Sequence, residues 1–348
     1  MLVNDYALLD DDTLSKYKSV VKSRVFKYYI LVRYIIYEVL WLALVLPRAI
    51  RSAWYYYFQH RFSNTKLHKD IRYSTKRTRN TFDIYEPIRR ADGNPCIIFI
   101  HGGSWQFGDK IQYVLLGKKL SSHGVITVIA NYTLYPKGKL NEQLEDVESL
   151  TNYVHDHIGS YGGRQDDIHL MGHSAGSHII AQYVLTKKDS DKAHIRSLIG
   201  MGGVYDINMH FVHEATRGLE HLSAMRPNCY GPAGFKQSSP THVISNRRQE
   251  QPLPHIYLMH GVADLTVPST SSNIFYKMLT MNNVDKQRLA LLLYESTGHI
   301  DLVYKIMDDD VCYDHKLTGL ETGPCTRYPS SILHDVLQLI RRGDQQQS

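Results

Sequence analysis

The stretch Ile168-His169-Leu170-Met171-Gly172-His173-Ser174-Ala175-Gly176 places a G-x-S-x-G motif directly after a short apolar run. Helical periodicity begins at the serine, so the sequence predicts a strand, a sharp turn and a helix, the context in which this motif presents a serine at the end of a sheet. Side chains in place of Gly172 and Gly176 would collide with neighbouring backbone in so tight a turn. The pattern alone is common, and an ordinary loop serine is the competing interpretation.

Short apolar runs alternate with segments of helical period from about residue 73 onward. This alternation predicts a mostly parallel central sheet flanked by helices, because strands buried on both faces are apolar throughout. The predicted strands are residues 96–100, 125–130, 168–171, 198–201, 255–260 and 289–294. The predicted helices are residues 110–122, 141–158, 174–185, 270–281 and 330–340. Residues 206–254 do not fit the alternation and predict a small cap over the carboxyl edge of the sheet, where ligands bind in such folds.

A second motif, His101-Gly102-Gly103-Ser104-Trp105, begins at the end of the strand predicted at residues 96–100. In sheets of this kind, a glycine pair at this place points backbone N–H groups at an oxygen that becomes negative during acyl transfer. We therefore predict an oxyanion hole formed by the N–H groups of Gly102, Gly103 and Ala175. A glycine pair that ends a strand is otherwise only a turn.

A carboxylate and an imidazole follow Ser174 in the order Ser, Asp, His. Asp264 comes four residues after the strand at 255–260, and His299 follows the strand at 289–294. Serine is a poor nucleophile at neutral pH, so an imidazole must take its proton and a carboxylate must hold that imidazole. We predict Ser174, His299 and Asp264 as a catalytic triad. Asp301 is the alternative carboxylate, but it lies too close in sequence to His299 to reach its far nitrogen, and His173 is expected to pack.

Residues 28–47 read YYILVRYIIYEVLWLALVLP, about the length of a helix that crosses a bilayer. Aromatic and basic residues flank the stretch on both sides, as is typical of a membrane interface. Glu38 argues against a simple crossing, because a carboxylate is costly near the bilayer centre. We expect a membrane-associated helix within an N-terminal region of residues 1–72, followed by a hydrolase domain of residues 73–348. The alternative is an amphipathic helix that packs on that domain or lies in the interface.

The composition gives 40 Lys and Arg against 34 Asp and Glu, a net charge of +6, and much of the excess lies between Lys16 and Arg79. Basic residues beside an apolar stretch suit anionic lipid head groups, and no nucleic-acid-binding motif accompanies them. The expected partner is therefore a lipid membrane and not nucleic acid. The four cysteines lack CxxC spacing and predict no zinc site. Whether Cys312 and Cys325 form a disulfide stays open.

Several motifs resemble those of the isoprenylcysteine α-carbonyl methylesterases, within a wider group of HGG-type esterases that also holds kynurenine formamidases. They are HGGSW at 101–105, NYTLYPKG at 131–138, SYGG at 160–163, IHLMGHSAGSHI at 168–179, GGVYDI at 202–207, HGVADLTVP at 260–268 and LYESTGHIDL at 293–302. The likeness covers roughly residues 82–305, and SYGG, GGVYDI and the hydrophobic N-terminal stretch discriminate best. Ser104 stands where a third glycine is common, and residues 308–328 look peculiar to this chain.

The resemblance implies an α/β-hydrolase fold and an enzyme of the endoplasmic reticulum or Golgi membrane that removes the methyl ester from a farnesylated or geranylgeranylated C-terminal cysteine. It implies Ser174 as nucleophile, His299 as base and Asp264 as acid, with no cofactor and no metal. Residues Trp105, Phe211 and Tyr230 are expected to contact the substrate. The alternatives are a general carboxylesterase or lipid esterase, a kynurenine formamidase-like amidase, and a binding module, against which the complete triad argues.

Overall fold

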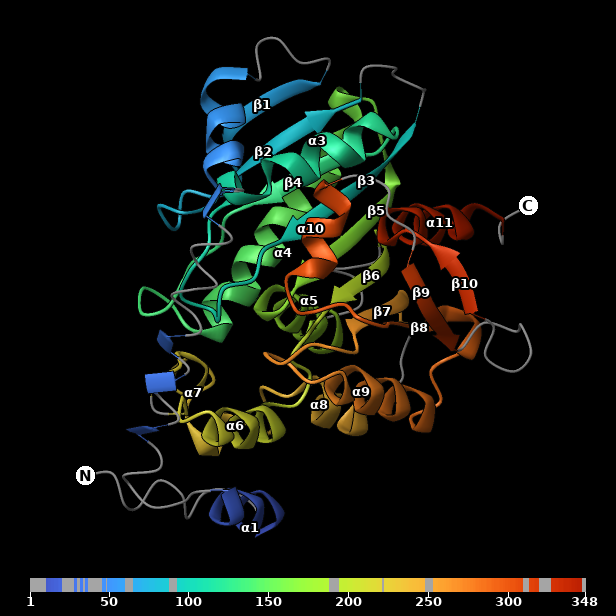
Figure 1. Cartoon of the computed structure of the whole chain (residues 1–348). Coiled ribbons are helices and arrows are strands. Elements are labelled where there is room, and N and C mark those ends of the chain that lie inside the picture. Colours follow the sequence, from blue (N-terminus) through green and yellow to red (C-terminus); the bar gives the residue numbers. More distant parts are fainter. Residues whose placement is uncertain are drawn as a thin grey trace.

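The computed structural model describes residues 11–20, 28–29, 32–33, 35–36, 46–47, 49–59, 65–87, 93–187, 194–220, 222–247, 253–308, 313–318 and 327–345. In this part of the chain, ten strands form one sheet in the order β1-β2-β4-β3-β5-β6-β7-β8-β9-β10 (Figure 1). The strands are β1 Lys66–Arg72, β2 Thr81–Glu86, β3 Asn94–Ile100, β4 Ile126–Ala130, β5 Gly163–His173, β6 Ile195–Met201, β7 His255–Gly261, β8 Leu289–Tyr294, β9 Tyr313–Thr318 and β10 Arg327–Ser330.

The six central strands, β3 to β8, are the six that the sequence predicts, and each pairs in parallel with its neighbours in this set. The sequence does not predict the other four strands. Strands β1 and β2 pair antiparallel beside β4, and β9 and β10 pair antiparallel beyond β8. Strand β1, KLHKDIR, is polar and lies at the sheet edge, where charged side chains are normal. It also lies within residues 1–72, so this part of the N-terminal region joins the sheet.

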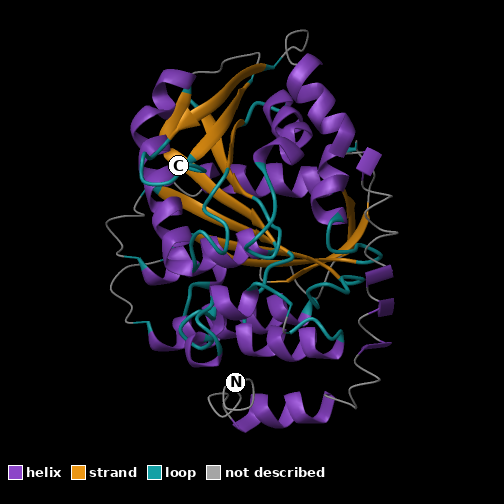
Figure 2. Cartoon of the chain, turned by 90° about the vertical axis from the view of Figure 1, so that its left-hand side faces the viewer, coloured by secondary structure: helices purple, strands orange, loops and turns teal. Residues whose placement is uncertain are grey.

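Helices cover both faces of the sheet, as Figure 2 shows. Successive residues of β3 face opposite sides: Ile98 and Ile100 contribute to one apolar cluster, and Ile97 and Phe99 to the other. The first cluster contains side chains of α4 Leu140–His157, α5 Ala175–Thr186 and α9 Thr270–Met281. The second contains side chains of α3 Val114–Ser122, α10 Asp301–Met307 and α11 Ile332–Gln345. The sequence predicts all of these helices except the short α10.

Residues 206–220 and 222–247, within the insertion predicted at residues 206–254, form helices over the carboxyl edge of the sheet. The elements of this cap are α6 Ile207–Thr216, α7 Met225–Asn228, η7 Pro232–Gly234 and α8 Pro240–Asn246. Asp206 caps α6 by accepting a hydrogen bond from the N–H of Met209. Helix α8 packs on α5 and α9, so the cap is fixed to the domain beneath it.

Besides β1, two helical segments of the N-terminal region contact the hydrolase domain. Helix α1 Asp11–Val20 packs on α6, where Tyr17 stacks on Phe211 with ring centroids 5.4 Å apart. Farther along, the π-helix η2 Tyr55–Gln59 buries Tyr55 and Tyr56 in the second apolar cluster. Most of the stretch predicted as a membrane helix, residues 28–47, lies outside the described residues. Within the described part, no helix is both long enough and apolar enough to cross a membrane.

Candidate active site

Ser174 lies in the turn between β5 and α5 with φ 55° and ψ −119°, a conformation that non-glycine residues rarely adopt. The two flanking glycines make this turn possible. A Cβ on Gly176 would lie 2.1 Å from the carbonyl oxygen of Ile100, and a Cβ on Gly172 would lie 2.7 Å from the backbone of Gly176. The N–H of Ser174 donates to the carbonyl of Met201 at 2.9 Å. The strand-turn-helix that the sequence predicts therefore holds the serine at the carboxyl edge of the sheet.

Asp264 and His299 are joined by a hydrogen bond of 2.6 Å between His299 Nδ1 and Asp264 Oδ2. The other carboxylate oxygen, Oδ1, accepts the backbone N–H groups of Thr266 and Val267 at 2.8 Å each. Burial raises the pKa of Asp264, but the imidazoles of His299 and His260 outweigh it and hold that pKa well below its usual range. Asp264 is therefore ionised and accepts the proton of Nδ1, which leaves Nε2 of His299 as the nitrogen that can take a proton.

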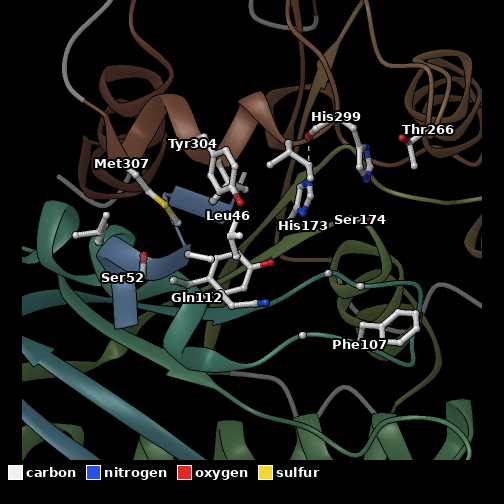
Figure 3. A pocket seen from close by; sticks show the side chains of 18 of the residues that line it. Leu46, Ser52, Phe107, Gln112, His173, Ser174, Thr266, His299, Tyr304 and Met307 are labelled. Carbon is white, nitrogen blue, oxygen red and sulfur yellow. Dashed lines mark hydrogen bonds between the residues drawn. The ribbon is translucent and has the colours of Figure 1, made fainter. Parts of the chain in front are cut away.

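Ser174 and His299 line the same cavity of about 390 Å³ (Figure 3). In the described structure no hydrogen bond joins the Ser174 hydroxyl to His299 Nε2; such contacts are often loose before substrate binds. Gly202, which has φ +56°, leaves room for the imidazole, because a Cβ there would lie 3.3 Å from His299 Nδ1. The sequence shows this glycine in GGVYDI but does not indicate its neighbour.

The predicted oxyanion residues lie around Ser174. Gly102 and Gly103 line the cavity, and Ala175 is the first residue of α5. A Cβ on Gly102 would lie 3.0 Å from the Cβ of Ser174, and a Cβ on Gly103, which has φ +121°, would lie 2.3 Å from the carbonyl oxygen of Phe107. Only glycine therefore lets this backbone approach the serine so closely.

His101 orients the peptide between the two glycines. It is fully buried, and burial lowers its pKa to about 4, so the ring is neutral at pH 7. Its Nδ1 donates a hydrogen bond of 2.8 Å to the carbonyl oxygen of Gly102. Because the C=O and N–H of a trans peptide point in opposite directions, this bond turns the N–H of Gly103 away from His101. The sequence shows His101 in the motif without indicating this role.

His173, inside the G-x-S-x-G motif, packs against His299 with ring centroids 4.7 Å apart. Burial, followed by the nearby His299, lowers the pKa of His173 to about 3, so its ring is neutral. Its Nε2 donates to the backbone carbonyl of His299 at 2.9 Å. The packing role expected from the sequence thus includes a specific hydrogen bond to the loop that carries His299.

The structure does not bring Trp105, Phe211 or Tyr230 into the cavity that Ser174 lines. Trp105 is 2% exposed, and its Nε1 donates to Nδ1 of His178 at 3.1 Å. Phe211 is fully buried between Tyr17 and Phe235. Tyr230 lies near Lys139, and its hydroxyl accepts the N–H of Asn141. All three stabilise the cap and the loops around the site, so substrate contact by these residues has no support in the structure.

No group of three or more His, Cys, Asp or Glu side chains among the described residues could hold a metal ion. Cys96 and Cys229 are buried free thiols, and burial raises the pKa of each, Cys229 to about 12. Cys312 and Cys325 lie outside the described residues. A buried thiol with a raised pKa is a weak nucleophile, so these two cysteines are core residues.

Comparison with known proteins supports the resemblance seen in the sequence. The sequence profile of the BD-FAE family matches residues 82–279. A probable isoprenylcysteine alpha-carbonyl methylesterase of Oryza sativa subsp. japonica is 29% identical over 272 residues, 74% of this chain and 62% of that protein. Another of the same description, from Arabidopsis thaliana, is 30% identical over 276 residues, 74% of this chain and 55% of that protein. The chain thus spans less than two thirds of the length of these curated relatives.

The fold is also shared with solved structures. Esterase B from Lactobacillus rhamnosis superposes with a TM-score of 0.62, covering 93% of this chain and 98% of that chain, at 16% sequence identity. A likeness at this identity shows the fold alone. Together with the sheet order and the matched profile, it confirms the predicted α/β-hydrolase architecture.

Proposed function

Because the chain belongs to the BD-FAE family of α/β-hydrolases, we propose that it is a serine esterase that acts through Ser174, His299 and Asp264. The observation that carries the proposal is the 2.6 Å bond between His299 Nδ1 and ionised Asp264, on the wall of the cavity that Ser174 also lines. This bond selects the tautomer in which Nε2 can act as a base toward a serine hydroxyl. The names of the curated relatives as methylesterases support the same reaction class.

The reaction proceeds in two acyl-transfer steps. The Oγ of Ser174 bonds to the ester carbonyl carbon while its proton passes to Nε2 of His299. The bond from that carbon to the alcohol oxygen then breaks, and the alcohol leaves with the proton. In the second step, a water gives one proton to His299 while its oxygen bonds to the acyl carbon. The bond from that carbon to Ser174 Oγ then breaks, Ser174 takes the proton from His299, and the released acid loses its own proton to solvent and becomes a carboxylate.

Negative charge on the carbonyl oxygen is stabilised by the N–H groups of Gly102, Gly103 and Ala175. These are backbone donors held in place before substrate binds, so no reorganisation is needed when charge develops. The hydrogen bond from His101 to the Gly102 carbonyl keeps one of these peptides in orientation. Each such donor contributes a few kcal/mol to the transition state.

The substrate we propose is an isoprenylcysteine methyl ester, with methanol as the leaving alcohol. The relatives' names support it, and so does the cavity. Among the described residues that line the cavity, Arg51 and Asp308 carry charged side chains of the Lys, Arg, Asp and Glu types, and these two pair with each other at 3.0 Å. A zwitterion such as N-formylkynurenine needs charged partners, whereas an apolar ester does not. A general carboxylesterase that takes other apolar esters is the second candidate, favoured by the same lining.

Methanol release from farnesylcysteine methyl ester tests this function directly. We expect release by the wild-type protein and a loss on the order of 10³-fold or more in Ser174→Ala, with labelling of the wild type alone by a fluorophosphonate probe. Ser122→Ala, at an exposed serine outside the site, is the matched control. Labelling without methanol release from this ester, but with hydrolysis of simple acyl esters, would favour the second candidate. Absence of labelling contradicts the esterase proposal itself.

We also propose that the N-terminal region attaches the protein to a lipid membrane, at the endoplasmic reticulum or Golgi. Large apolar side chains that are more than half exposed support the proposal, among them Tyr28, Tyr29, Ile36, Ile50, Trp54 and Phe58. Phe107, which lines the cavity, is 64% exposed as well. An exposed apolar surface of this kind suits a lipid interface.

Residues 11–20 and residues 49–59 both contact the hydrolase domain, so we place them on the same face of the membrane. Co-sedimentation of the full chain with vesicles of phosphatidylcholine and phosphatidylserine tests attachment, and Trp54→Ser with Phe58→Ser should weaken it. Protease accessibility of an N-terminal tag, compared with a C-terminal tag, in sealed microsomes tests the side. Full recovery of the protein in the supernatant would contradict the attachment, and opposite protection of the two tags would contradict the shared face.

A further inference from the structure

The cavity that contains Ser174 extends well beyond the catalytic residues. In Figure 3 it runs from His299 and Ser174 toward Met307 and Ser52, with Tyr304 between. Its far part is therefore lined by α10 on one side and by the N-terminal region on the other. We call this part the distal arm and define it by Leu46, Ala49, Ser52, Val303 and Met307.

Helix α10 forms one wall of the distal arm. It begins two residues after His299, and Ile300, Val303, Tyr304 and Met307 all line the cavity. Their spacing of three, four and seven residues places them on one face of the helix. With a rise of 1.5 Å per residue, this face extends about 10 Å from Ile300 to Met307. The wall thus leads away from the catalytic base over the length of an extended chain of several methylene groups.

The N-terminal region forms the opposite wall. Ala49 and Ser52 line the cavity and belong to residues 49–54, which are helical, and Ser52 is 2% exposed. This segment is held by the π-helix that follows it. The Tyr56 hydroxyl accepts a hydrogen bond of 3.2 Å from the buried Lys110, and Lys69 donates to the Tyr56 carbonyl. Removal of residues 49–54 would therefore open one side of the arm.

The two ends of the cavity differ in chemistry. Near Ser174 the lining is polar, with the imidazoles of His173 and His299 and the backbone of Gly102 and Gly103. In the distal arm it is Leu46, Ala49, Val303 and Met307 with Ser52, while Gln112, Tyr113 and Tyr304 add polar groups to the rest of the lining. At the end of the arm Arg51 bonds Asp308 at 3.0 Å, with 57% and 31% of these side chains exposed. A substrate with a polar reactive group next to a long apolar group matches this order of the cavity lining.

We propose that the distal arm is the subsite for an extended apolar chain on the acyl side of the ester, and that Met307 and Ala49 limit the length of chain it accepts. The proposal rests on the esterase function above: with methanol as the alcohol, a long chain has to be part of the acyl group. It gives Leu46, Ala49 and Ser52, which precede the hydrolase domain, a direct role in substrate selection. Burial of each added methylene should raise kcat/KM up to about fourfold until the arm is full.

A chain-length series tests the subsite. We would measure kcat/KM for p-nitrophenyl acyl esters from acetate to dodecanoate, below their micelle concentrations, with the full chain. The wild type should prefer the longer chains. Met307→Trp, which fills the arm, should lower the ratio of kcat/KM for dodecanoate to that for acetate at least tenfold, and Met307→Ala should shift the optimum toward longer chains. Met281→Trp, at a 74% exposed methionine on α9, is the matched control and should leave the ratio unchanged.

A second pair of variants tests the N-terminal wall. Ala49→Trp should lower the same ratio, whereas Ala53→Trp, in the same helical segment but outside the lining, should not. An alkyl acetate series, with the chain on the alcohol side, separates the two sides of the ester. If kcat/KM depends on chain length only in the alkyl acetate series, the assignment of the arm to the acyl side is overturned. If the ratio of kcat/KM for dodecanoate to that for acetate is the same in the wild type and all variants, the subsite is overturned and the esterase proposal stays intact.

Direct binding keeps the subsite testable apart from catalysis. Dansyl-labelled undecanoic acid should bind the Ser174→Ala protein with enhanced fluorescence, and Met307→Trp in that background should weaken binding at least fivefold. Binding that is weakened in this way, without any ester hydrolysis by the wild type, would support the subsite and contradict the esterase. Binding that Met307→Trp does not alter would contradict the subsite, whatever the hydrolysis results.

Discussion

The imidazole of His173 donates a hydrogen bond of 2.9 Å from Nε2 to the backbone carbonyl oxygen of His299. The two residues are 126 positions apart, and the bond joins the turn that carries the proposed nucleophile to the loop that carries the proposed base. Because burial keeps His173 neutral, its Nε2 proton is available for this bond across the pH range in which an esterase acts. We infer that His173 is a positioning residue for His299.

Replacement of His173 tests the positioning role. In His173→Leu the carbonyl of His299 loses its donor, and we expect kcat to fall about tenfold or more with little change in KM, because a misplaced base affects the chemical step most. His173→Gln places an amide donor near the same position and should recover part of the activity. Steady-state kinetics and the pH–rate profile measure this, and equal loss in both variants with unchanged profiles would indicate a packing role only.

Asp264→Asn should lower kcat on the order of 10³- to 10⁴-fold while the fold is retained. The asparagine carbonyl can still accept the N–H groups of Thr266 and Val267, but its NH₂ group then faces His299 Nδ1. The imidazole must present a lone pair to that group and so carries its proton on Nε2, the wrong nitrogen for a base. Steady-state kinetics measure kcat, and thermal unfolding checks that the fold is retained. Asp301→Asn, at the alternative carboxylate, is the control and should lower kcat far less.

Gly102→Ala should lower kcat about 10²- to 10³-fold, the size of effect expected when an oxyanion donor is displaced. The added Cβ would lie 3.0 Å from the Cβ of Ser174 and from the carbonyl oxygen of His173, so the loop has to shift away from the serine. Gly159→Ala, where nothing lies within 4 Å of the added Cβ, is the matched control. Unchanged kcat in Gly102→Ala would remove this loop from the proposed oxyanion hole.

Stability should fall as the pH drops from about 6.5 toward 4. Burial lowers the pKa of His101 and His178 to about 4 and that of His173 to about 3 in the folded chain. Below pH 6.5 the unfolded chain binds protons on these three imidazoles and the folded chain does not, so each contributes a loss of about 1 kcal/mol per pH unit. Glu214, whose pKa burial raises to about 7, acts in the opposite direction, as does Asp83, whose pKa burial also raises. Burial lowers the pKa of four further imidazoles, those of His194, His210, His213 and His255, and these add to the fall.

Urea unfolding at pH 7.0, 6.0 and 5.0 measures this dependence. The free energy of unfolding should decrease at each step, and the decrease should be smaller in His178→Gln, which removes one of the three imidazoles. His178 donates from Nε2 to the carbonyl of Ser238, so the substitution itself lowers stability at every pH. The quantity to compare is therefore the change in the free energy of unfolding per pH unit. A free energy that rises on acidification would contradict the assignment of these histidines as buried and neutral.

The sequence was sufficient to predict the six parallel strands, the turn around Ser174 and the positions of Asp264 and His299. Each of these depends on a local pattern: an apolar run buried on both faces, two glycines in a turn too tight for a Cβ, or a polar side chain directly after a strand. Parallel strands bring their carboxyl ends to one edge, so residues that follow different strands converge whatever their separation in sequence. The parallel sheet was therefore enough to predict that Ser174, Asp264 and His299 lie at the same edge.

The surroundings of the site depended on contacts that no local pattern encodes. Trp105, Phe211 and Tyr230 have the side chains of substrate contacts, but packing against His178, Tyr17 and Asn141 keeps them out of the cavity. Met307 and Ser52 are 255 positions apart in sequence, yet both line the distal arm. Hydrophobic burial is non-directional, so the sequence indicates which side chains are buried but not which of them come into contact. Only the packed tertiary structure decides those contacts.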